Sequence, residues 1–261
     1  MDKGLAAVTI CMMFSLAGCS ESNTSSSIAT PPSMFEEIHT TGKLTDEQAE
    51  ALSSEQDLDL NSVTSITDAQ AESLSNVENL RLNGLTSIND SQANSLGKVK
   101  LLELNGLTSL TDAQAESLGA IDDLQLNGLT SISESQAKSL GRGFLLDLNG
   151  ITSLTDTQAE SLSQLKVLRL NGLSSITDAQ AEILSNLNWL GLGGVTSITD
   201  AQAKSLSKIN NSEDDGPTDL KLLELTGLTS ITDTQAEILS EVGPLSVPES
   251  IRSRINKFKS K

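Results

Sequence analysis

The sequence predicts an α/β repeat solenoid, in which stacked units of one short strand and one short helix share a continuous core. Leu-x-Leu pairs recur every 22 residues, and a single 33-residue step before the last pair indicates an 11-residue insertion. A capping pattern, Thr, Asn or Ser followed three residues later by Gln, recurs nine times in step with these pairs. A fixed period of this length is typical of stacked repeats and not of a globule with one central core. The pairs are Leu58/Leu60, Leu80/Leu82, Leu102/Leu104, Leu124/Leu126, Leu146/Leu148, Leu168/Leu170, Leu190/Leu192 and Leu223/Leu225.

The bulk composition restricts both the core and the partners. Aromatic residues make up only 2% of the 261 residues, so Leu, Ile, Val and Ala must fill the core. The formal net charge is −18, whereas neutralising phosphates requires clusters of Lys and Arg. We therefore expect no nucleic-acid partner, and we expect the acidic surface to keep the array soluble and monomeric.

Residues 1–18 are predicted to be a signal peptide. Lys3 provides a positive start, and Leu5–Leu16 is an apolar stretch too short to span a bilayer comfortably. The sequence Leu-Ala-Gly-Cys that ends at Cys19 resembles the lipobox of bacterial lipoproteins. The resemblance implies cleavage before Cys19, its acylation as a stable membrane anchor and, with Ser20 next, sorting to a bacterial outer membrane. An ordinary signal peptide cut nearby is the alternative.

The two cysteines agree with this interpretation. Cys11 lies in the segment removed and Cys19 would be acylated, so the mature chain would have no thiol for a disulfide or a metal site. Residues 19–33 are rich in Ser and Thr and have little to bury, so we expect a disordered tether. The segment 34–57 repeats the helix half of the unit without a strand and is predicted to be an N-terminal cap.

Residues 80–101 illustrate one repeat. Leu80 and Leu82 alternate with polar residues, which predicts a short strand with one buried face. Gly84 ends the strand, because glycine tolerates the backbone angles of a tight corner. Asn89 and Gln92 then form a capping box at the start of a helix of about two turns. The acid that follows each cap lies at the positive end of the helix dipole.

A single repeat cannot be stable by itself. It offers roughly seven apolar side chains worth ~1.5–3 kcal/mol each when buried, whereas ordering costs ~1.5 kcal/mol per residue. Stacking on both sides is needed to close the core, and the two ends need caps.

This pattern resembles the leucine-rich repeat family, whose unit reads Leu-x-x-Leu-x-Leu-x-x-Asn/Cys-x-Leu. The Ile-Thr-Asp step into each helix is similar to the cysteine-containing subclass and to bacterial repeats with that signature. The resemblance covers residues 56 to about 242 and implies an arc with a concave parallel β-sheet and short convex helices. The Asn/Cys position is apolar in this chain, which predicts apolar packing there: Val63, Leu85, Leu107, Leu129, Ile151, Leu173, Val195 and Leu228.

Two irregularities interrupt the repeats, which we assign to residues 58–242. Gly143 replaces the apolar residue of other units, and Phe144 is expected to fill the gap. The insertion 210–220 has the composition of an exposed acidic loop. Its carboxylates are also a weak candidate Ca²⁺ site, although their spacing does not match an EF-hand; they belong to Glu213, Asp214, Asp215 and Asp219.

The last segment, 243–261, is predicted to contain an amphipathic helix. Ile251, Ile255 and Phe258 recur at helical spacing, and basic residues line the other side. We expect this helix to cap the last repeat. A basic helix resting on lipid headgroups is the alternative.

Outward strand positions should form columns across the sheet. The middle column, from Asp59 to Glu224, mixes charges and should be solvated. The next column is Asn from Asn61 to Asn171 and predicts a ladder of hydrogen bonds between repeats, with sugar binding as the alternative.

The column before these turns apolar toward the C-terminal end. It contains the only Trp, and Gly191, Gly193 and Gly194 should leave room beside it. Exposed apolar patches often form contacts, and Trp is a favoured anchor. We predict a protein or peptide site here unless a cap, a loop or the insertion covers it: Leu145, Val167, Trp189 and Leu222, with Arg169 of the middle column.

The sequence contains no nucleophile–base set, metal cluster or phosphate-binding loop, and His39 in the cap is its only histidine. An enzyme is therefore not expected, and neither is a cofactor. The function predicted is that of a lipid-anchored leucine-rich-repeat protein of a bacterial envelope, periplasmic or surface-exposed, that binds protein through its concave sheet. A passive structural component of the envelope without a specific ligand is the alternative.

Overall fold

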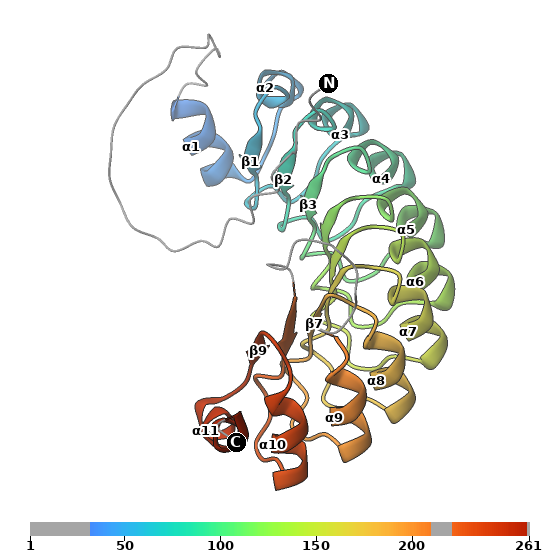
Figure 1. The fold of residues 1–261 in the computed structure, drawn as a ribbon. Coiled ribbons are helices and arrows are strands. Elements are labelled where there is room, and N and C mark those ends of the chain that lie inside the picture. The colour runs from blue at the N-terminus through green and yellow to red at the C-terminus, as the bar shows by residue number, and fades with distance from the viewer. Residues whose placement is uncertain (1–31, 210–220, 260–261) are drawn as a thin grey trace, which may run out of the picture.

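The computed structural model describes residues 32–209 and 221–259. Nine parallel strands form one sheet in the order β1 to β9, and a helix lies between each strand and the next along the chain. The sheet lines the inside of an arc, the short helices between the strands line the outside, and the first and last helices lie at its two ends (Figure 1). The predicted leucine-rich-repeat solenoid is therefore confirmed.

The 22-residue period sets the register of the sheet. Leu58 pairs with Leu80, and each central leucine of β1 to β8 is buried below the sheet. The 33-residue step leaves the pairing intact, because Leu190 of β7 still pairs with Leu223 of β8. The strands are β1 (Asp57–Asp59), β2 (Asn79–Arg81), β3 (Leu101–Glu103), β4 (Asp123–Gln125), β5 (Leu145–Asp147), β6 (Val167–Arg169), β7 (Trp189–Gly191), β8 (Leu222–Glu224) and β9 (Leu245–Ser246).

Short convex helices follow the strands, and the predicted capping box is present at all nine helices from α2 to α10. Each box satisfies two backbone N–H groups that a helix N-terminus otherwise leaves unpaired. The helices are α1 (Pro32–Thr41), α2 (Asp46–Leu52), α3 (Asp68–Leu74), α4 (Asp90–Leu96), α5 (Asp112–Leu118), α6 (Glu134–Leu140), α7 (Asp156–Leu162), α8 (Asp178–Leu184), α9 (Asp200–Leu206), α10 (Asp233–Ser240) and α11 (Glu249–Lys259).

The capping glutamine has a second role that the sequence did not reveal. In α5, Gln114 Oε1 accepts a hydrogen bond from the Thr111 N–H at 2.9 Å, as the capping box requires. The Nε2 of Gln114 donates to the Ile88 carbonyl of the preceding repeat, also at 2.9 Å. The same bond recurs from α3 to α10, so each cap also connects two repeats.

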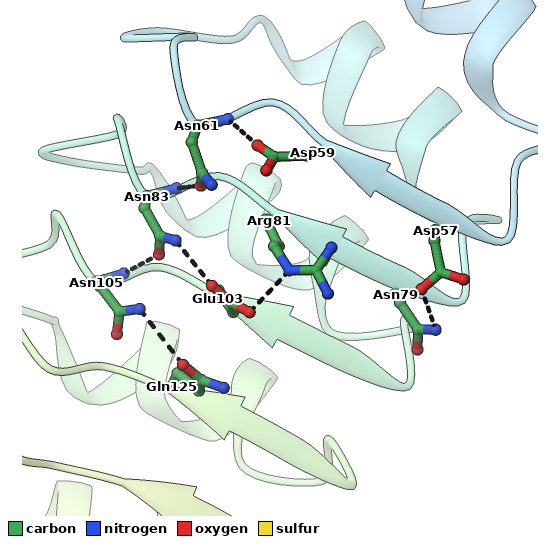
Figure 2. A network of polar contacts seen from close by, with 9 residues as sticks. All are labelled: Asp57, Asp59, Asn61, Asn79, Arg81, Asn83, Glu103, Asn105 and Gln125. Atoms are coloured by element: carbon green, nitrogen blue, oxygen red, sulfur yellow. Dashed lines mark hydrogen bonds and ion pairs between the residues drawn. The ribbon is translucent and has the colours of Figure 1, made fainter. Parts of the chain in front are cut away.

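The asparagine ladder is confirmed. The Asn83 N–H donates to Asn61 Oδ1 at 3.0 Å (Figure 2), and the series continues to the Gly193 N–H on Asn171 Oδ1. The apolar residues two positions later, such as Leu85, are fully buried. On the sheet side, side-chain hydrogen bonds between repeats are therefore made by the asparagine column. The position that is usually Asn or Cys contributes packing alone.

The reason proposed for the corner glycines was wrong. Among the described glycines, only Gly42 has a positive φ, 65°. A Cβ on Gly84 would instead lie 2.5 Å from the carbonyl oxygens of both Asn61 and Val63. The repeat therefore needs glycine because neighbouring backbones approach closely, not because the corner needs unusual backbone angles.

The expectation for Phe144 was also wrong. Its side chain is 38% exposed and does not fill the gap beside Gly143. The backbone fills that space itself, since a Cβ on Gly143 would lie 2.6 Å from the Ile121 carbonyl oxygen.

At the N-terminal end, α1 begins at Pro32, two residues before the predicted cap boundary, and Ile38 is fully buried in the core. The signal peptide, Cys19 and the tether up to residue 31 lie outside the described residues, as do the insertion 210–220 and its candidate Ca²⁺ ligands. Among the residues that the structure describes, every helix is too short or too polar to span a bilayer.

At the C-terminal end, the repeats extend one unit beyond their predicted limit at residue 242. Leu245 pairs with Leu223, one period of 22 residues earlier, and β9 adds a ninth strand. The helix α11 packs on α10 with Ile251 and Ile255 buried. Its apolar side is therefore used within the array and is not available to a lipid surface.

Candidate binding site on the concave sheet

The sheet register brings the predicted apolar residues together. They occupy the first position of four neighbouring strands, β5 to β8, and pair directly with one another across the concave face. We call this set the C-terminal strip: Leu145, Val167, Trp189 and Leu222.

The burial of the strip differs from the prediction. Val167 is fully buried and Trp189 is only 9% exposed, so the expectation of an open apolar strip was wrong at these two positions. Leu145 and Leu222 are half-buried and remain the accessible apolar members.

Arg169 connects the strip to the charged middle column. Its guanidinium carbon lies 4.5 Å from the centre of the Trp189 ring, within the range of a cation–π contact. Its Nη1 also donates to both carboxylate oxygens of Asp147, at 2.8 and 3.0 Å. Asp147 is 6% exposed, so the prediction of a solvated column was wrong there.

The glycines beside Trp189 do not leave an empty space. A Cβ on Gly191 would lie 3.2 Å from Cγ of Arg169, and one on Gly193 would lie 2.9 Å from Asn171 Oδ1. The missing side chains therefore allow Arg169 and Asn171 to lie across the sheet.

Two polar atoms of this region are buried without a hydrogen-bond partner: Nε1 of Trp189 and Oδ1 of Asp123. An unsatisfied buried polar atom costs about 1–3 kcal/mol, and native structures contain few of them. One is a donor and the other an acceptor, and both are covered by neighbouring side chains, so a partner would pair with them only after those side chains move aside.

The carboxylates of the region are electrostatically strained. Burial, together with the negative charges of Asp147 and Glu103, raises the pKa of Asp123 to about 6, against the opposing effects of Arg169 and of a hydrogen bond with Gln125. Burial also raises the pKa of Asp147, although its ion pair with Arg169 lowers it. A cation near Asp123 would therefore relieve an existing penalty.

The N-terminal half of the concave face is different, because its polar groups bind one another (Figure 2). Glu103 accepts from Nε of Arg81 at 3.0 Å and from Nδ2 of Asn83 at 2.8 Å. Asn79 donates to Asp57 of the preceding strand. The two unsatisfied buried atoms lie outside this network, on β4 and β7.

The structure offers no alternative metal centre in the part of the chain that it describes. Residues 32–209 and 221–259 contain no group of three His, Cys, Asp or Glu side chains that could hold an ion.

Comparison with known proteins supports the fold. No protein-family profile matches the sequence, and no curated protein matches it. A chain of the Toll–Spatzle complex of Drosophila is 13% identical, with a TM-score of 0.54 over 82% of this chain and 33% of that chain. This chain therefore spans about a third of the Toll complex chain, and the likeness concerns the repeat fold alone.

Two Listeria monocytogenes proteins are also similar, with lower superposition scores. One internalin is 15% identical, with a TM-score of 0.47 over 87% of this chain and 85% of that chain. Internalin C2 is 20% identical, with a TM-score of 0.47 over 88% of this chain and 96% of that chain.

Proposed function

We propose that this protein binds another protein through the C-terminal half of its concave sheet. The observation that carries the proposal is the pair of unsatisfied buried atoms, Nε1 of Trp189 on β7 and Oδ1 of Asp123 on β4, in the same column of the concave face as Leu145 and Leu222. Half-buried Leu145 and Leu222 provide apolar surface on the same face.

A polypeptide segment fits this surface better than a compact small molecule. The strip crosses four parallel strands, which places its ends about 14 Å apart at the usual strand spacing. A segment lying across the strands presents backbone donors and acceptors at regular intervals along this length. The Toll complex chain whose fold is similar is bound to a protein, Spatzle, and the net charge of −18 disfavours nucleic acid.

The experiment replaces the accessible apolar residues and leaves the buried ones in place. Leu145→Asn and Leu222→Asn are compared with Leu101→Asn, a half-buried leucine in the same column of β3 but outside the strip. Each variant, immobilised after its fold is checked by circular dichroism, is used to capture partners from bacterial envelope extract. Loss of the captured protein with the first two variants alone supports the proposal. Equal capture by all three, or no specific capture by the parent, contradicts it and favours a passive envelope component.

The proposal includes a lipid anchor at Cys19 in a bacterial outer membrane. Its support is the sequence, where an apolar stretch ends in Leu-Ala-Gly-Cys and Ser20 follows. Mass spectrometry of the mature N-terminal peptide should find an acylated Cys19, and Cys19→Ser should abolish processing there. An unmodified N-terminus elsewhere would contradict the anchor. Protease treatment of whole cells then distinguishes periplasmic from surface display.

A further inference from the structure

A second candidate site lies beneath the C-terminal helix. A pocket of about 340 Å³, open to solvent on one side, lies between α11, the segment before β9 and the end of the sheet. We call it the cap cavity. It is lined by Leu222, Gly243, Pro244, Leu245, Val247, Arg252, Ile255, Asn256 and Lys259.

The lining combines an apolar floor with positive charge. Val247 and Ile255 are buried, and Leu222 and Leu245 are half-buried. None of the lining residues is acidic, whereas Arg252 and Lys259 are both cationic. This contrasts with the chain as a whole, whose net charge is −18. Local charge of this kind attracts an anion to a surface that otherwise repels it.

Arg252 is held in a position suited to binding. Its Nη2 donates to the Leu245 carbonyl at 3.2 Å, which fixes the guanidinium beside the cavity and leaves other N–H groups free to donate. The carboxylate of Glu249 is 3.9 Å from its Nε and belongs to an 85% exposed side chain, so the pair is weak. Lys259 lies seven residues further along α11, on the same side of the helix.

We propose that the cap cavity binds a carboxylate carried on a small apolar body. The guanidinium of Arg252 and the ammonium of Lys259 would receive the carboxylate, since a guanidinium matches its two oxygens geometrically. The apolar body would lie against Leu222, Val247 and Ile255. Both a free monocarboxylic acid and the C-terminus of a polypeptide have this chemistry.

The position of the cavity is relevant to the second of these ligands, the C-terminus of a polypeptide. Leu222 lines the cap cavity and also ends the C-terminal strip, so the two sites adjoin. A chain end bound in the cavity would reach the strip, but carboxylate binding does not depend on the function proposed above.

The test measures binding to the full mature chain by isothermal titration calorimetry with four probes. They are 4-methylpentanoate, its neutral amide, a pentapeptide ending in leucine with a free carboxylate, and the same peptide amidated. At least one free acid is expected to bind, and about tenfold or more tighter than its amide, because charge-assisted hydrogen bonds are lost on amidation. Binding of the small acid would identify a free carboxylate as sufficient, and binding of the peptide acid alone would identify a chain end.

Variants matched in charge locate the binding. Arg252→Gln and Lys259→Gln are each expected to weaken acid binding about tenfold, whereas Lys257→Gln, which lies outside the lining, should have no effect. Lys259→Gln removes an exposed side chain, so it remains informative if Arg252→Gln disturbs the fold, which circular dichroism would detect. Absence of binding by both acids, equal binding of acids and amides, or equal weakening by Lys257→Gln would overturn the proposal.

Discussion

The double role of the capping glutamines predicts a larger stability loss than capping alone would cause. Gln114 in the middle of the array is 7% exposed and makes two bonds, one to the Thr111 N–H and one to the Ile88 carbonyl of the preceding repeat. The Thr111 hydroxyl forms the other half of the box, because it accepts a hydrogen bond from the Gln114 N–H at 3.1 Å. It also donates an exposed hydrogen bond to Asp90. Both side chains cap the helix, but only Gln114 makes a buried bond to the preceding repeat, since the bond from Thr111 to Asp90 is exposed.

The magnitudes follow from the groups left unpaired. Thr111→Ala is expected to cost about 1 kcal/mol, the usual value for an N-cap. Gln114→Ala also removes the donor to the buried Ile88 carbonyl, so it should cost about 2–4 kcal/mol. Gln114→Glu retains an acceptor for the Thr111 N–H but places a carboxylate oxygen against the Ile88 carbonyl oxygen, and this repulsion should keep its cost within the same range of about 2–4 kcal/mol.

Urea unfolding followed by circular dichroism at 222 nm measures these differences. The comparison requires an unchanged dependence of the unfolding free energy on urea, because repeat arrays can lose cooperativity. If Gln114→Ala and Thr111→Ala cost the same, the buried bond from Gln114 to the Ile88 carbonyl contributes nothing and the reasoning fails.

Three further predictions concern the sheet side of the array. Gly128→Ala should destabilise the fold by about 1–3 kcal/mol in urea, because its Cβ would lie 2.4 Å from the Asn105 carbonyl oxygen; a neutral or stabilising effect would contradict the close approach. The pKa of Asp123 is raised from 3.8 to about 6 in the folded state, so its contribution to stability is present below about pH 4 and is lost as pH rises through 6. Asp123→Asn should therefore reduce the fall in stability between pH 4 and 7, and an unchanged pH profile would refute the shift. Arg169→Ala leaves the buried carboxylate of Asp147 without its partner and should cost about 3–5 kcal/mol at pH 7, with a smaller loss under acid conditions where Asp147 is protonated; thermal unfolding at both pH values checks this.

The sequence predicted where the candidate site lies, but not which of its side chains are buried or which polar atoms lack a partner. The 22-residue period, with the one 33-residue step before Leu222, placed the four residues of the strip side by side, because each repeat advances the sheet by one strand. Their burial depends on how Arg169 lies over Trp189 and pairs with Asp147. A repeat period in the sequence does not predict these side-chain contacts. The unsatisfied atoms of Asp123 and Trp189 are likewise properties of packing between repeats.

The missed ninth strand shows a limit of the pattern itself. Leu245 and Val247 continue the period from Leu223 and Leu225, so a signal was present. It is a Leu-x-Val pair with Pro248 directly after it, where the other units have a longer run to their helix. The basic residue Arg254 stands where the next N-cap would be, and binds Asp233 of α10 at 2.8 Å as the N-caps bind the preceding acid elsewhere.

By itself, the sequence determined the order of the strands, their register, the buried leucines and the nine helix caps. These features follow from local patterns repeated at a fixed spacing, so each unit specifies its own strand and helix. Only the tertiary structure decided why the corners need glycine, where each glutamine donates and which concave side chains are buried. Those outcomes depend on distances between atoms 20 or more residues apart, and these distances exist only once the repeats have stacked.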